Sequence, residues 1–191
     1  MNTRPIPHSQ SYPAGHACPT RHARGFTMIE VLITIVVLSF GLLGLAGLQL
    51  TSLKHSRSSV LRTLAIQHAY DMADRMRGNL AAVGAGSYDM STPGSGTNTA
   101  ACLTTAACTP AQMAGQDIYE WQRALNASTN TSSNGLPSGQ GIVCIDSTSE
   151  STSTPAAPAC DNLGQLYRIK VWYLDDTADN NLKVIVVDFQ A

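Results

Sequence analysis

The longest apolar run in the chain extends from Val31 to Leu53 and contains no charged residue. A helix of this length, rising about 1.5 Å per residue, crosses the roughly 30 Å hydrocarbon core of a bilayer. Residues 1–25 precede the run and contain three arginines, three histidines and no acid. Because basic residues beside an apolar span stay in the cytoplasm, the pattern predicts a membrane helix over 26–53 with the rest of the chain exported.

The helical pattern continues beyond the apolar run, with an amphipathic segment over 54–79. Its apolar residues recur at steps of three and four and form one stripe: Leu61, Leu64, Ala65, His68, Met72 and Met76. No proline occurs between Phe26 and Leu80, and Gly78-Asn79 is a typical helix end. We therefore expect one helix over about 26–77. Gly41, Gly44 and Gly47 either form a close packing face or let the helix unwind locally.

Residues 80–191 show the mixed pattern of a small α+β head. Residues 81–107 are rich in Gly, Ser and Thr and predict a loop. Thr109, Pro110 and Gln112 fit a helix start with a capping box, and the helix is expected to end before Ser128. Trp121 on its apolar stripe is expected to be an anchor on the sheet or on the long helix.

Three strands are predicted in the remainder of the head, over Ile142–Asp146, Leu166–Leu174 and Leu182–Phe189. The last strand contains four consecutive apolar residues and is expected to be central or well covered. The predicted fold is a long helix packed against a small antiparallel sheet with a short extra helix.

Four of the five cysteines lie in the head: Cys102, Cys108, Cys144 and Cys160. An even number in an exported segment favours two disulfides, for example within the first pair and within the second, although four cysteines allow three pairings. The alternative is four free thiols. A zinc site is disfavoured because no CxxC pair occurs.

The segment between the last two strands, residues 175–181, predicts a hairpin turn. Asp175, Thr177, Asp179 and Asn181 also show the alternate spacing of calcium ligands. The glycine and the terminal glutamate of an EF-hand loop are absent, so the turn is the preferred interpretation.

No catalytic or nucleotide-binding motif occurs in the chain, and all five histidines lie in the basic leader or on the long helix. The sequence therefore predicts neither an enzyme nor a bound cofactor. The net charge is −1, and the head carries few basic residues, namely Arg123, Arg168, Lys170 and Lys183. This pattern does not support a nucleic-acid site.

The segment Gly25-Phe26-Thr27-Met28-Ile29-Glu30-Val31-Leu32-Ile33 resembles the prepilin motif of type IV pilins and type II secretion pseudopilins. The resemblance implies cleavage by prepilin peptidase after Gly25, with removal of leader 1–25, and N-methylation of Phe26. It also implies that Glu30 pairs with the terminal amine of a neighbouring subunit during assembly. The alternative is an interfacial Glu30 that only faces lipid headgroups, since a carboxylate at the edge of a membrane span is costly.

The head resembles, more loosely, the PilV-type minor pilins. The similarity rests on the cysteine-bearing loop, the helix with Trp121, the turn over 136–141 and the strand ending Val171-Trp172-Tyr173-Leu174-Asp175. It implies a minor pilin in the inner membrane and the pilus fibre, which initiates or modifies pilus assembly and supports twitching, attachment or DNA uptake. Its implied partners are other major and minor pilins and the assembly machinery. The alternatives are a minor pseudopilin of a type II secretion system and a membrane-anchored adhesive module.

Overall fold

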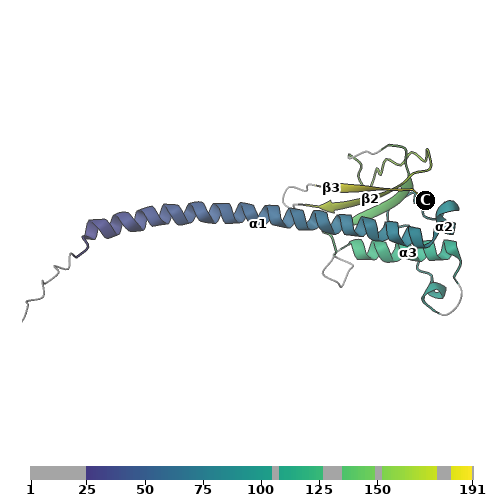
Figure 1. Cartoon of the computed structure of the whole chain (residues 1–191), viewed down its shortest axis with the longest axis horizontal. Coiled ribbons are helices and arrows are strands. Elements are labelled where there is room, and N and C mark those ends of the chain that lie inside the picture. The colour runs from purple at the N-terminus through teal and green to yellow at the C-terminus, as the bar shows by residue number, and fades with distance from the viewer. Residues whose placement is uncertain (1–24, 105–107, 127–134, 149–151, 176–181, 191) are drawn as a thin grey trace, which may run out of the picture. The chain divides into compact units, whose positions relative to one another are not determined.

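The computed structural model describes residues 25–104, 108–126, 135–148, 152–175 and 182–190. The elements follow in the order α1, α2, a short 3₁₀ helix η1, α3, β1, β2 and β3 (Figure 1). The chain separates into two compact units, one up to Gly47 and the other from Leu48 onward, and each is described by itself. The α+β class predicted from the sequence is confirmed.

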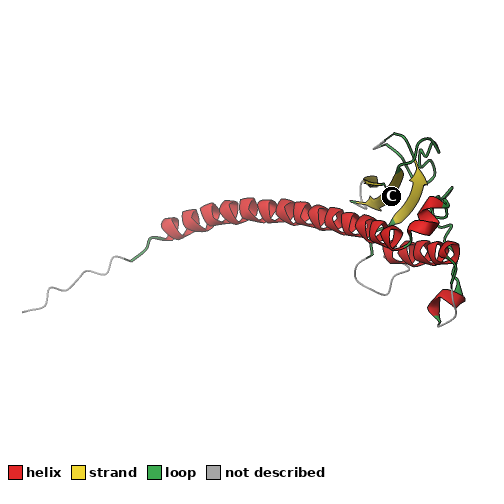
Figure 2. Ribbon diagram, turned by 45° about the vertical axis from the view of Figure 1, so that its right-hand side comes forward, coloured by secondary structure: helices red, strands yellow, loops and turns green. Residues whose placement is uncertain are grey.

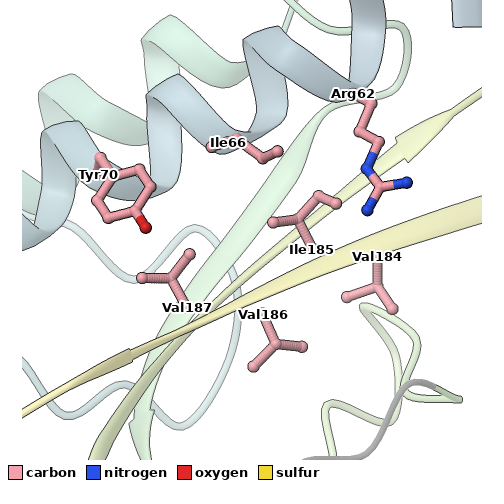
Figure 3. A pocket seen from close by; sticks show the side chains of 7 residues that line it. All are labelled: Arg62, Ile66, Tyr70, Val184, Ile185, Val186 and Val187. Atoms are coloured by element: carbon pink, nitrogen blue, oxygen red, sulfur yellow. The ribbon is translucent and has the colours of Figure 1, made fainter. Parts of the chain in front are cut away.

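Helix α1 spans Met28–Gly78 without a break (Figure 2). The predicted helix over 26–77 is therefore confirmed to within two residues at each end. Local unwinding at 41–47 is not observed, because this segment lies inside the regular helix. The small residues there leave the backbone hydrogen bonds of the helix intact.

The part of α1 in the second unit forms one wall of the head's hydrophobic core. Its buried residues follow the expected helical spacing: Leu61, Ala65, Ala69, Met72, Ala73 and Met76. Three of these six are alanines, and small side chains let neighbouring elements approach the helix closely. The amphipathic stripe predicted from the sequence thus faces the core, and alanines at 69 and 73 complete it.

Helix α3 spans Pro110–Leu125 and runs beside the C-terminal part of α1 (Figure 1). The predicted capping box is confirmed: Thr109 Oγ1 accepts from the Gln112 amide, and the Gln112 side chain accepts from the Thr109 amide. Trp121 is fully buried and donates from Nε1 to the carbonyl of His68 at 2.8 Å. Its expected role as an anchor between the head and α1 is confirmed.

The sheet has three antiparallel strands in the order β1-β2-β3, over Gln140–Ile145, Tyr167–Leu174 and Leu182–Phe189. The three predicted strands are confirmed, with small shifts at their ends. The expectation that the last strand is central is wrong. Strand β3 lies at an edge of the sheet and is only half-buried along Val184–Val187, whereas β2 lies in the middle and is buried. A run of four consecutive apolar residues indicates a buried strand, but it does not distinguish an edge strand from a central strand of the sheet.

The predicted loop over 81–107 is also partly wrong, and its residues 105–107 lie outside the described residues. Residues Leu80–Gly84 form helix α2, and Ala100–Leu103 form the 3₁₀ helix η1. Alanine has the highest helix propensity, and the Asn79 carbonyl accepts from the amides of Ala82 and Val83. This local hydrogen bonding continues helical structure past the predicted stop, although the glycines farther along had indicated a loop.

The face of the sheet that carries Lys170 and Trp172 is covered by the loop that joins β1 to β2. Trp172 Nε1 donates to the Ser153 carbonyl at 2.8 Å. Lys170 is fully buried, and its ammonium donates to the Asp146 carboxylate at 2.6 Å and to the carbonyls of Pro158 and Ala159 at 2.8 and 2.9 Å. Three acceptors satisfy all three protons of the ammonium. This arrangement explains how a charged residue in the central strand is buried.

Candidate functional site

The candidate processing site lies at the beginning of α1. Gly25 and Phe26 precede the helix, and Phe26 is 84% exposed. Thr27 marks the helix start: its carbonyl accepts from the amides of Glu30 and Val31 at 3.1 and 3.3 Å, and its hydroxyl accepts from the Glu30 amide at 3.3 Å. A threonine at this position satisfies helix amides that have no partner within the helix. The predicted cleavage bond between Gly25 and Phe26 is therefore in an exposed, non-helical segment.

Glu30 lies in the first turn of α1 and is exposed. An acid in the first turn interacts favourably with the helix dipole. Its position three residues after Thr27 is also that of the acid in a capping box. The position of Glu30 therefore suits a local capping role, which is separate from the pairing with a neighbouring subunit that the prepilin motif implies.

The first unit exposes an apolar helix surface over its described length, residues 25–47. Large apolar side chains occur on every side of this segment, including Ile35, Phe40 and Leu43, which are between 56% and 72% exposed. Helix α1 is long and apolar enough to cross a membrane, by its length and composition. An apolar surface of this extent needs a membrane or a protein partner to cover it.

The four head cysteines form two disulfides, Cys102–Cys108 and Cys144–Cys160, with Cα atoms 5.0 and 6.1 Å apart. The structure thereby selects one of the three pairings that the sequence left open. The second disulfide joins β1 to the end of the loop that Lys170 binds. Both bridges close segments of the head, so their role is to hold its loops.

A polar network at the end of α1 was not predicted from the sequence. Arg75 binds Asp71 at 3.1 Å within α1, and Asp117 and Glu120 of α3 at 3.3 and 3.1 Å. The hydroxyl of Tyr88 donates to Asp117 at 2.6 Å. Burial and this hydrogen bond raise the pKa of Tyr88. Only the spacing of Asp71 and Arg75 is visible in the sequence, because the other partners come from a distant helix.

The remaining candidate sites find no support among the described residues. That part of the chain holds no cluster of three or more His, Cys, Asp or Glu side chains suited to a metal. Of the calcium alternative at 175–181, residues 176–181 lie outside the described residues, and Asp175 accepts from Ser58 Oγ at 3.0 Å. Arg168 and Lys170 are buried, so neither contributes to an exposed basic surface for nucleic acid.

Comparison with known protein families gives two matches, one for each unit. Residues 20–46 match a model described as a prokaryotic N-terminal methylation motif, and residues 47–119 match one described as type IV pilin Tt1218. The chain is thus similar to a methylation motif near its start and to a type IV pilin model over the segment that follows. Neither a curated protein nor a solved structure gives a significant match. The methylation match includes Gly25, Phe26 and Glu30, and the pilin match extends from α1 into α3.

Proposed function

We propose that this chain is a structural subunit of a type IV pilus, and specifically a minor pilin of the PilV type. The observation that carries the proposal is the methylation motif at the start of a long helix whose apolar first part is exposed. The pilin match over residues 47–119 supports it. Pilins are structural proteins, and the chain accordingly has a role in assembly and not in catalysis.

In this proposal prepilin peptidase cleaves after Gly25, removes residues 1–25 and leaves Phe26 as the N-methylated first residue. The apolar part of α1, up to about Leu53, holds the subunit in the inner membrane with the head in the periplasm. On assembly the same surface enters the core of the fibre and contacts other pilins. The minor pilin then helps to initiate or modify the pilus, in support of motility, attachment or DNA uptake.

The role of Glu30 is the part of the proposal that a substitution tests best. Two changes separate its two possible roles, because glutamine can replace glutamate in a capping box but carries no charge. If Glu30 pairs with the terminal amine of a neighbour, Glu30→Gln and Glu30→Ala both reduce the amount of this chain in sheared pili. In each case cleavage after Gly25 continues.

The measurement is quantitative mass spectrometry of the chain in sheared pili and in membranes. Normal incorporation of Glu30→Gln with reduced incorporation of Glu30→Ala would assign Glu30 to helix capping and contradict the pairing role. Recovery of the chain in a secretion filament instead of a pilus would favour the pseudopilin alternative.

A further inference from the structure

Helix α1 begins very close to the proposed cleavage bond. Gly25, Phe26 and Thr27 are non-helical, and the helix starts at Met28. In an α-helix each peptide carbonyl accepts from the amide four residues farther along. A peptidase therefore reaches a peptide bond inside a helix less easily than one in an exposed, non-helical segment. The residue at which α1 begins thus decides how accessible the bond between Gly25 and Phe26 is.

The sequence that precedes Thr27 does not by itself prevent a helix from extending toward the N-terminus. The nearest proline on that side is Pro19. Ala23 and Arg24, which lie between them, are residue types with high helix propensity. Because a helix grows by adding one hydrogen bond per residue once it has formed, a specific interaction is needed to fix its first residue.

Thr27 provides this interaction with its side chain and its backbone. The Thr27 hydroxyl accepts from the Glu30 amide at 3.3 Å, and the Thr27 carbonyl accepts from the amides of Glu30 and Val31 at 3.1 and 3.3 Å. A residue that caps a helix in this way keeps non-helical backbone angles itself. The helix therefore stops at Thr27, and the bond before Phe26 stays outside it.

Gly25 is the competing first residue. Glycine ranks beside threonine as a helix N-cap, and both are much better N-caps than valine or alanine. If α1 began after Gly25, the Gly25 carbonyl would accept from the Ile29 amide, and the cleavage bond would lie in the first helical turn. The Thr27 hydroxyl is thus the group that favours the later start of the helix over the earlier one.

We propose that Thr27 is a positioning residue for the cleavage. Its hydroxyl fixes the start of α1 at Met28, which keeps the bond between Gly25 and Phe26 non-helical and available to prepilin peptidase. Thr27 acts through the backbone conformation of Phe26 and not by contact with the reacting atoms. This inference rests on the proposed function, because it concerns the same cleavage.

The test compares the cleavage of the full native chain by purified prepilin peptidase in detergent with that of Thr27→Val, Thr27→Asn and Thr34→Val. Valine keeps the branched shape of threonine and removes the hydroxyl, whereas asparagine is a good N-cap of different shape. Thr34→Val is the matched control. It makes the same chemical change inside α1, where the Thr34 hydroxyl donates to the Val31 carbonyl at 2.8 Å.

Thr27→Val should lower kcat/KM about fivefold, which is the change in population that the loss of a typical N-cap produces. The loss should appear as a higher KM with unchanged kcat, because a smaller fraction of the substrate has the cleavable backbone conformation. Thr27→Asn and Thr34→Val should be cleaved like the native chain. The Cα chemical shift of Phe26, measured by NMR on the uncleaved chains, should move to a helical value in Thr27→Val alone.

Equal cleavage of Thr27→Val and the native chain would overturn the inference. Slow cleavage of Thr27→Asn would also overturn it, because the peptidase would then recognise the threonine side chain itself. A lower kcat, or an unchanged Phe26 chemical shift in Thr27→Val, would have the same consequence. If the peptidase does not cut the native chain between Gly25 and Phe26, the result contradicts the proposed function instead.

Discussion

The two parts of helix α1 share one continuous backbone but have opposite surroundings within the chain. From Met28 to Gly47 every residue is exposed, although most side chains are large and apolar. From Leu48 to Gly78 six residues are buried, and Arg75 adds ion pairs to α3. The second part therefore has its partners within the head, whereas the first part needs partners outside the chain.

In the proposed pilus subunit, the second part of α1 stabilises the head and the first part serves assembly. Substitutions in the first part should change processing or incorporation and leave the unfolding of the head unchanged. Substitutions in the second part and in its contacts should destabilise the head. Single substitutions in the two parts of α1 and in the head test this separation.

The largest effect is expected from Gly25→Val. A branched side chain at the predicted cleavage position should block processing, so that the chain keeps its leader and is lost from sheared pili. Immunoblots for size and for pilus content measure both outcomes. The thermal unfolding of the head, measured on the full chain in detergent, should stay the same. Efficient cleavage of this variant would contradict the assignment of the site.

Trp121→Ala should have the largest effect on the head. The fully buried indole packs in the core and donates to the His68 carbonyl. Loss of such a side chain costs about 3–5 kcal/mol of unfolding free energy. In contrast, Ile35→Ala in the exposed part of α1 should change the unfolding free energy of the head by less than about 0.5 kcal/mol. Urea unfolding of the full chain in detergent measures both, and similar values for the two variants would remove the distinction.

Lys170→Met should destabilise the head by about 3–5 kcal/mol at neutral pH, because Asp146 is then a buried carboxylate without its cation. In the native chain burial raises the pKa of the Asp146 carboxyl, but hydrogen bonds from Lys170 and Thr148 outweigh this and lower it below its usual 3.8. The contribution of the pair is therefore present above pH 3.8 and is lost as the pH falls through the lower, folded-state pKa.

The corresponding measurement is the unfolding free energy of both chains as a function of pH. The difference between native chain and Lys170→Met should shrink as the medium becomes acidic, because protonation of Asp146 removes the unpaired charge of the variant. A difference that is constant with pH would show that Lys170 stabilises the head by packing alone.

Among the changes within the head, the smallest effects are expected from the disulfides. Their sequence separations are 16 for Cys144–Cys160 and 6 for Cys102–Cys108. The chain-entropy model gives a loss of about 3 kcal/mol for the first bridge and about 2 kcal/mol for the second. Paired Cys→Ser variants, unfolded in urea, measure each contribution. A larger loss at Cys102–Cys108 would show that this bridge does more than close a short loop.

Much of this fold could be predicted from local sequence patterns. The apolar run, the stripe around Met72 and the capping box at Thr109 are set by residues close together in the chain. The edge position of β3 could not be predicted, because strand order depends on contacts between distant segments. For the same reason, the sequence did not predict the three acceptors of Lys170 or the ion pairs between Arg75 and α3. In both cases the partners come from other segments of the chain.

The candidate processing site stays a prediction, and it is the feature that the sequence specifies most locally, because its motif is a short linear segment. Gly25, Phe26 and Glu30 lie within nine consecutive residues of the motif, and the structure adds the exposed, non-helical state of the first two. The disulfide pairing, in contrast, required the fold, because spacing alone allowed three solutions.

The central claim is that the exposed part of α1 is the mature N-terminal segment of a pilus subunit. Mass spectrometry of the chain recovered from sheared pili tests this most directly. We expect a chain that begins at an N-methylated Phe26. Recovery of a chain that begins at Met1, or at an internal cut near residue 50, would contradict it.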